Sequence, residues 1–348
     1  MLGQQEIWSD KVGNVAQVGG IETAVLDNGI SRGMRIAWIN TGAGLRFKVL
    51  LDRAMDIADA AYNQHNLAWL NHAGFTPPQP LSDKGLDWLR TFGGGLVNTC
   101  GLSHVGGPEK DAFGERGVHG NISNIPAEIV SIIQPDPENG NMNMSITGII
   151  RESKIFGPAL ELRRTISATL GLPGFQIHDE ISNRGNTPAP HMILYHCNFG
   201  WPLADKGSQL IWKGKMLARD GNDFPNGEAF KTCPDTLINH SGNGEEVAIV
   251  DIEATENGEC ICGIHNPTLE LAVAIQFNKQ ELPWMTNWQH WGKGEYVTGL
   301  EPGSHPPIGQ SKARENETLI FIAPGKRIQY NLSFKAIQGN ENIRTIFH

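Results

Sequence analysis

The chain has 348 residues, 39% of them hydrophobic, and a net charge of −9 at pH 7, which is typical of a globular protein with a substantial core. The acidic balance without a basic cluster argues against nucleic acid or an anionic membrane as a partner. Residues 1–10 lack the apolar segment of a secretory signal, and no apolar run approaches the roughly 18 residues of a membrane helix, so we expect no membrane association.

Glycine and proline are frequent, whereas cysteine is sparse. The 41 glycines and 20 prolines are spread along the chain, which is typical of many short strands joined by turns. The five cysteines are odd in number, and the lone pair Cys260 and Cys262 has no matching second pair, so we expect reduced thiols, a cytoplasmic location and neither a metal nor a cofactor. No repeat or linker divides the sequence, so we expect one domain over residues 1–348, with residues 1–20 as an N-terminal arm.

The first elements are three predicted strands, residues 24–26, 35–39 and 45–51, followed by the charged run 52–59. Charge runs are usually solvated turns. Here apolar residues interleave with the charges, so we expect Arg53 and Asp56 to be partly buried at a pocket rim, where buried charges need partners.

A proline-rich loop separates two tryptophan-containing segments, and residues 86–90 in the second predict a short helix. The triple glycine at 93–95 lacks the lysine and hydroxyl residue of a phosphate-binding loop, so we interpret it as a site of close backbone approach. Trp69 and His104 are candidates for contacts with a small ligand.

His119 lies between two glycines in a loop that leads into a predicted strand. Loops held by a rigid scaffold commonly carry function, although a turn histidine without a role fits the same pattern. Four further strands are then predicted, at residues 127–134, 143–151, 160–170 and 175–182.

Residues 192–199 predict a strand that Gly200 and Pro202 end. Alternation places His196 and Asn198 on one face, and Tyr195 and Cys197 on the other. A histidine and an amide at a strand end suit a small polar ligand, but a satisfied buried histidine is an equal alternative. The opposite orientation of neighbouring residues argues against Cys197 as a nucleophile paired with His196.

The remaining chain predicts a loop-rich region at 204–241 and strands at 246–254, 260–265, 269–277, 317–322 and 327–334. Lys279 follows one of these strands. The segment 282–291 mixes three tryptophans, including Trp288, with polar residues, which favours the wall of a sugar site over a core strand. Glu301 closes a strand and precedes a proline, where a fixed carboxylate suits general-base catalysis.

Three motifs, residues 118–120, 195–199 and 299–302, followed by the turn 323–325, together resemble the aldose 1-epimerase (galactose mutarotase) superfamily. The run 52–57 resembles an uncharacterised branch of that superfamily. The resemblance extends from about residue 46 to residue 334. It implies an all-β fold, a large antiparallel β-sandwich.

The resemblance also implies a reaction and three catalytic residues. Glu301 would take the proton of the anomeric hydroxyl, His196 would protonate the ring oxygen, and His119 would hold the sugar. The ring then opens, rotates about its C1–C2 bond and recloses as the other anomer. The partner would be a small sugar or sugar derivative, and a homodimer stays open.

Residues 197–201 depart from the usual pattern after the central histidine, and the place of the substrate-binding arginine at Arg53 rests on a different local motif. The charges of Arg53, Asp56 and Lys279 point to an acidic or phosphorylated sugar. Two other functions stay open. One is isomerisation at another carbon, in which a metal held by His104, His119, His196 and Glu301 could assist. The other is carbohydrate binding without catalysis.

Overall fold

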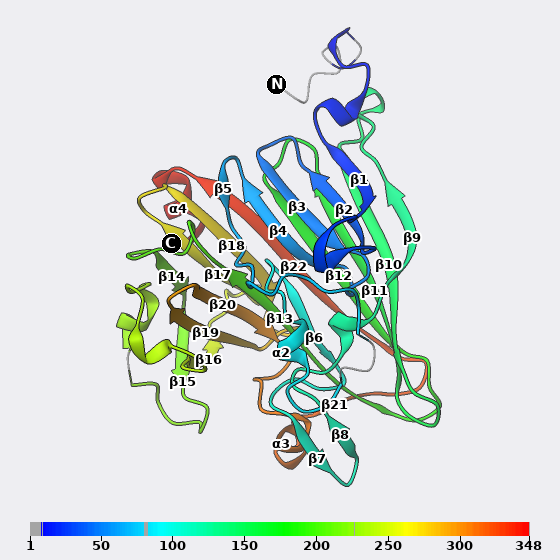
Figure 1. Ribbon diagram of the computed structural model, residues 1–348, viewed down its shortest axis with the longest axis vertical. Helices are drawn as coiled ribbons and strands as arrows, with labels where there is room; N and C mark the ends of the chain where they lie inside the picture. The colour runs from blue at the N-terminus through cyan, green and yellow to red at the C-terminus, as the bar shows by residue number, and fades with distance from the viewer. Residues whose placement is uncertain (1–7, 9, 80–82, 226, 348) are drawn as a thin grey trace.

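The computed structural model describes residues 8, 10–79, 83–225 and 227–347 and consists mainly of antiparallel sheets (Figure 1). A five-stranded sheet is formed in chain order by β1 (Gly20–Val25), β2 (Arg35–Asn40), β3 (Leu45–Leu50), β4 (Asp56–Tyr62) and β5 (His65–Asn66). Its strands are joined by short connections, as the turn residues predicted.

The two larger sheets run through the rest of the chain. In spatial order the eight-stranded sheet contains β14 (Gln209–Trp212), β17 (Glu259–Asn266), β18 (Leu271–Asn278), β22 (Arg327–Gln338), β12 (Gly174–Asn183), β11 (Ala159–Thr169), β10 (Asn143–Ser153) and β9 (Glu128–Ile133). The seven-stranded sheet contains β15 (Gly214–Leu217), β16 (Glu246–Ile252), β19 (Trp284–Gly292), β20 (Glu295–Gly303), β13 (Ala189–Phe199) and β21 (Ile320–Ile322), with β6 (Asn98–Leu102) also paired to β13.

The remaining elements are short. A hairpin joins β7 (Glu109–Asp111) to β8 (Gly114–Arg116), and the α-helices are α2 (Trp88–Thr91), α3 (Gln310–Glu315) and α4 (Asn340–Phe347). Single 3₁₀ turns occur at Val15–Gln17, Gly29–Ser31, Ile122–Asn124, Pro137–Asn139, Gly227–Lys231 and Ile238–His240. No helix in the described part of the chain is long and apolar enough to cross a membrane.

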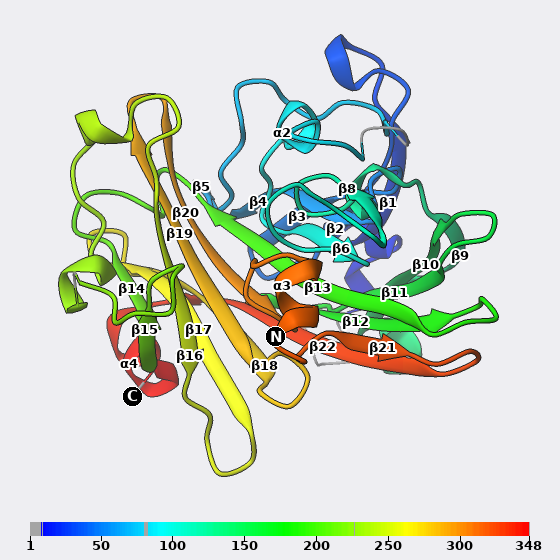
Figure 2. The same ribbon diagram turned by 90° about the horizontal axis from the view of Figure 1, so that it is seen from below.

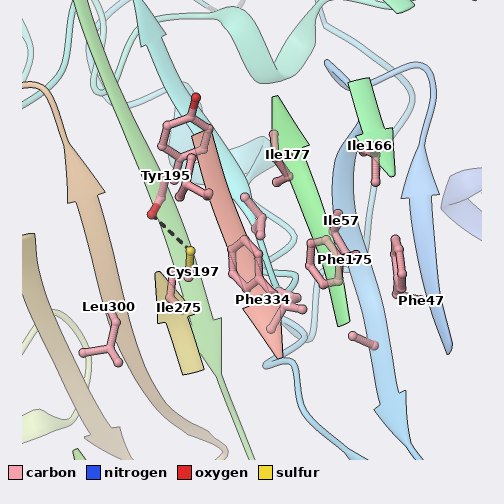
Figure 3. Close-up of a cluster of buried hydrophobic side chains, with 14 of the residues drawn as sticks. Phe47, Ile57, Ile166, Phe175, Ile177, Tyr195, Cys197, Ile275, Leu300 and Phe334 are labelled. Carbon is pink, nitrogen blue, oxygen red and sulfur yellow. Dashed lines mark hydrogen bonds between the residues drawn. The ribbon is translucent and has the colours of Figure 1, made fainter. Parts of the chain in front are cut away.

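One face of the eight-stranded sheet packs against both other sheets. Along β12, buried residues alternate with more exposed ones, as expected for a strand covered on a single side. Phe175 of β12 contacts Phe47 of the five-stranded sheet and stacks on Phe334 of β22, with ring centroids 4.5 and 4.6 Å away. Tyr195 from the seven-stranded sheet lies in the same hydrophobic cluster (Figure 3). The expected antiparallel β-sandwich is therefore confirmed.

Strand β13 is buried along both faces, apart from Pro190. Tyr195, Cys197 and Phe199 join the main core, whereas Met192 and Leu194 pack in a second cluster with Trp88 of α2. Figure 2 shows α2 and its neighbouring loops on one side of β13, and β11, β12 and β22 on the other. The predicted alternation is confirmed.

A buried ionic network lies against the core side of β13. The guanidinium of Arg164 donates to both carboxylate oxygens of Asp179 at 2.9 and 2.6 Å, and the hydroxyl of Tyr195 donates to the same carboxylate at 2.7 Å. Arg164 also donates to Asp56 at 3.3 Å, and burial raises the pKa of Asp56 to about 6. The network fixes the backbone of β13 directly behind His196.

Several elements differ from, or add to, those expected from the sequence. The region expected to be loops contains β14 and β15, whose four-residue strands are too short for a periodic signal. The charged run 52–59 is buried as expected, but β4 starts within it at Asp56. Glu301 does not end its strand, because β20 continues to Gly303. Helix α4 follows the last predicted strand. One domain over residues 1–348 stays a prediction.

Candidate active site

A cavity of about 760 Å³ lies over the face of the seven-stranded sheet that is turned away from the main core. Strands β13, β16, β19 and β20 supply its floor, and α2 and several loops supply its walls. Its lining residues are Trp69, Leu86, Trp88, Leu89, Phe92, Gly106, Gly107, Pro108, Val118, His119, His196, Arg219, Gly242, Asn243, Glu245, Val247, Thr286, Trp288, His290, Glu295, Val297, Glu301 and Pro307.

An acid–base couple lies at the floor of this cavity. Nε2 of His196 on β13 is 3.2 Å from Oε1 of Glu301 on the adjacent β20, and both side chains are almost fully buried. Thr286 lies directly opposite Glu301 in the β19–β20 register. An added Cβ at Gly299 would meet Oε1 of Glu301 and displace the carboxylate from its present position.

The surroundings of the couple disfavour charge on either member. Burial lowers the pKa of His196 to about 4. Burial also raises the pKa of Glu301 well above its ordinary value; Glu245 adds to this effect and Arg219 opposes it. At a pH between these two pKa values the couple holds one proton in total.

His119 approaches from the loop opposite the sheet. Its backbone is left-handed, with φ of 56°, and its N–H donates to the carbonyl of Gly106 at 2.9 Å. The imidazole lies against Trp88, with ring centroids 4.9 Å apart, and 6.2 Å from the ring of His196. Burial, followed by the proximity of His196, lowers the pKa of His119 to about 3, so the ring is neutral at pH 7.

Several buried polar atoms in the cavity have no hydrogen-bond partner among the described residues. They are Nδ1 of His119, Nδ1 of His196, Oγ1 of Thr286 and Oε1 of Glu301. Because buried polar atoms are nearly always paired, these four leave hydrogen-bonding capacity for water or a polar ligand. The set contains donors and acceptors, which suits hydroxyl groups.

Aromatic side chains form much of the wall. Trp69, Trp88, Phe92 and Trp288 all line the cavity. The ring of Trp288 meets that of His196 edge-on at 5.3 Å and that of Trp69 at 6.3 Å. The wall therefore offers flat apolar surfaces beside the polar floor. Of the three tryptophans in the segment 282–291, Trp288 is among the lining residues, whereas Trp291 packs in the main core.

Charged residues at the mouth were missed in the sequence. Arg219 is paired with Glu245, and the second oxygen of Glu245 accepts a hydrogen bond from Nε1 of Trp288 at 2.8 Å. Glu295 lies near His290, 3.8 Å away. Thr286 and His290 lie two residues to either side of Trp288 on the same strand. Strand alternation could therefore have predicted that they face the cavity together with Trp288. Arg219 and Glu245 lie outside the strands, where no periodicity points to them.

Arg53 and Asp56 are buried but do not line the cavity. The guanidinium of Arg53 donates to the carbonyls of Thr76 and Thr91 and to Asn124, at 3.2, 2.8 and 3.0 Å. Asp56 accepts hydrogen bonds within the ionic network behind β13. Both charged groups are therefore occupied in holding the scaffold.

Three further candidates also lie outside the lining. His104 contacts the carbonyl of Gly107 at 2.8 Å, next to the cavity. The amide of Asn198 donates to two backbone carbonyls, and Lys279 pairs with Asp251 at 2.6 Å, away from the cavity. With Arg53 and Lys279 both elsewhere, the reason to expect an acidic or phosphorylated ligand no longer applies.

Among the described residues, no group of three or more His, Cys, Asp or Glu side chains is arranged to hold a metal ion. The structure therefore does not support the metal-assisted alternative. His104, proposed as one of four ligands, points to the loop of Gly107 and not to the floor.

The fold is similar to several solved structures. A candidate aldose 1-epimerase from Klebsiella pneumoniae has a TM-score of 0.85 at 22% identity, over 96% of this chain and 88% of that protein. A galactose mutarotase-like protein from Clostridium acetobutylicum has a TM-score of 0.62 at 12% identity, over 92% and 99% of the two chains. A second candidate aldose 1-epimerase, from Escherichia coli K12, has a TM-score of 0.56 at 13% identity, over 88% and 100%.

At these identities the similarity shows the fold, a galactose mutarotase-like β-sandwich. No protein with a curated functional description matches the sequence. A family model described as "Domain of unknown function (DUF4432)" matches residues 31–336. Because this match spans most of the sequence, the chain belongs to the DUF4432 family.

Proposed function

We propose that the protein is an aldose 1-epimerase, an isomerase that interconverts the anomers of a small sugar. The observation that carries the proposal is the buried couple of His196 and Glu301, 3.2 Å apart at the floor of a cavity lined with unpaired polar atoms. The fold shared with candidate aldose 1-epimerases supports the same reaction class.

Opening a cyclic sugar requires a base and an acid on different oxygens. With the single proton of the couple on His196, Glu301 accepts the proton of the anomeric hydroxyl while His196 donates to the ring oxygen. The ring opens to the free aldehyde, rotates about C1–C2 and closes by the reverse transfers. Each positioned proton transfer typically contributes roughly 10²–10⁴-fold.

The surrounding residues have distinct roles in this proposal. His119 and Thr286 offer their unpaired atoms to sugar hydroxyls beside the couple. Trp288 and Trp69 cover the apolar face of the ring and exclude water. The five free, buried cysteines are consistent with action in the cytoplasm.

The test is exchange between anomers, measured by saturation-transfer NMR on a panel of aldoses, sugar acids and sugar phosphates. Because mutarotation also occurs in buffer, the quantity compared is acceleration over the uncatalysed rate. We expect acceleration with the wild-type protein and its loss, by at least about 10²-fold, in Glu301→Gln.

Glu259→Gln is the matched control, since Glu259 is exposed on β17 of the other large sheet. It should keep the wild-type rate. Tight binding of a sugar without acceleration would replace the proposal with a carbohydrate-binding protein. A new product signal would replace it with isomerisation at another carbon.

A further inference from the structure

We propose that Arg219 and Glu245 are positioning residues that hold the indole of Trp288 against His196 at the mouth of the active site. The proposal rests on the function proposed above and adds two residues to it. Both side chains line the cavity, and neither contacts His196 or Glu301 directly within hydrogen-bond distance.

Both carboxylate oxygens of Glu245 accept hydrogen bonds. Oε2 accepts from the indole N–H of Trp288 at 2.8 Å, and Oε1 is bound by the guanidinium of Arg219. Glu245 immediately precedes β16, in which Val247 is opposite Trp288 in the strand register. The carboxylate therefore reaches Trp288 from the neighbouring strand and fixes the rotation of its ring.

The fixed ring of Trp288 in turn packs against His196. Its ring meets His196 edge-on at 5.3 Å and Trp69 at 6.3 Å. It is partly exposed, so without the hydrogen bond to Glu245 the ring could turn toward solvent. The pairing keeps this ring beside His196, where it limits access of water to the couple.

The two charges also act on Glu301 with opposite signs. Glu245 raises the pKa of Glu301, and Arg219 lowers it. Other titratable groups near this carboxyl come from β13, β6 and the loop that carries His119. They are His196, Cys197, Cys100 and His119. Glu245 also raises the pKa of His196, and Arg219 also lowers the pKa of His119. The substitutions are therefore followed at the carboxyl of Glu301, on which the two charges act with opposite signs.

The experiment compares Glu245→Gln with Arg219→Gln. Glutamine keeps an acceptor for Trp288 but removes the charge of Glu245. We expect the pKa of Glu301, followed by NMR of ¹³C-carboxyl-labelled glutamate and assigned with Glu301→Gln, to fall by roughly 0.5–1 unit in Glu245→Gln and to rise by a similar amount in Arg219→Gln. The alkaline limb of the pH–rate profile should move in the same directions.

A third variant, Glu245→Ala, removes the acceptor as well as the charge. We expect kcat to fall roughly 10-fold or more below that of Glu245→Gln, because the ring of Trp288 is no longer fixed. Arg327→Gln, which removes an exposed charge at the start of β22, is the control for charge alone and should leave the titration of Glu301 unchanged.

The possible failures are distinguishable. Absence of anomer exchange in the wild type, with opposite shifts in the two charge variants, would overturn the proposed function and leave the effect of the two charges on Glu301 intact. Exchange in the wild type, with shifts that are absent or of the same sign, would overturn the positioning role. Equal kcat in Glu245→Ala and Glu245→Gln would also overturn it.

Discussion

At the scale of single residues, the central feature is that two buried ionisable groups lie side by side and that burial disfavours the charged form of each. Burial disfavours both the imidazolium of His196 and the carboxylate of Glu301, and Nε2 of His196 lies 3.2 Å from Oε1 of Glu301 without a hydrogen bond between them. An ion pair and a neutral pair differ only in where a single proton sits. A sugar that contacts both groups can therefore be protonated and deprotonated without exchange with solvent.

This proton count predicts a bell-shaped pH dependence of anomer exchange. Below about pH 4, His196 takes up a second proton, so no base is left and the rate falls. Above the raised pKa of Glu301, the couple loses its only proton, so no acid is left and the rate falls again.

The measurement is the protein-catalysed rate across pH after subtraction of the rate in buffer. A rate that rises monotonically to alkaline pH would contradict this proton count. Glu259→Gln provides the reference profile, since the substituted residue is exposed and remote from the couple.

Several site residues could be predicted from the sequence because a local pattern orients them. Strand alternation places His196 away from the core, and flanking glycines place His119 in a loop. Arg53 could not be placed in this way, because its partners Thr91 and Asn124 lie 38 and 71 residues away along the chain. Burial of a charge indicates that it has partners, and it does not indicate whether they are ligands or scaffold.

At the scale of elements, strand β13 contributes side chains both to the main core and to the candidate active site. Tyr195 points to the ionic network of Arg164 and Asp179, and the next residue, His196, points to the cavity. Because both side chains leave the same backbone, the network determines where the imidazole lies.

The network predicts a large loss of stability for Asp179→Asn. The substitution leaves Arg164 buried without its main counter-charge, so we expect the free energy of unfolding to fall by about 3–5 kcal/mol in denaturant titration. The neighbouring Glu180→Gln is the control. Its partner Arg327 is exposed, so the loss should stay near or below about 1 kcal/mol. Equal losses in the two variants would contradict this account.

Elements with a strong periodic pattern were predicted within a few residues, as for β10 to β12 and β22. Strand β4 was obscured, because its first residues, 56–59, belong to the charged run. Strands β14 and β15 depend on pairing with β17 and β16, about 50 and 35 residues further along the chain. Such short strands form because of their partners and not because of their own sequence.

At the scale of the whole molecule, three sheets enclose buried histidines that stay neutral. His191 on β13 contacts the carbonyl of Leu102 and the hydroxyl of Tyr330, each at 2.9 Å, and burial lowers its pKa to about 3. In the unfolded chain its pKa is near 6.5. The unfolded state therefore binds more protons between these values, and the stability present above pH 6.5 is lost as the pH falls toward 3.

We therefore expect the free energy of unfolding to decline steeply between pH 6.5 and 3. In His191→Gln the slope should be shallower by up to about 1.4 kcal/mol per pH unit, even though the variant is less stable at pH 7. Urea titrations at several pH values measure the slope. His178→Gln, on the less buried face of β12, should retain the wild-type slope. An unchanged slope in His191→Gln would contradict the assignment.

The five cysteines offer a way to follow how the sandwich comes apart. All are buried as free thiols, and burial raises the pKa of each one, so alkylation requires the chain to open first. Cys100 and Cys197 lie on strands that meet beneath the cavity, whereas Cys260 and Cys262 lie on β17. The order in which these thiols react with iodoacetamide would therefore map the sequence of opening across the two large sheets, with native residues as the reporters.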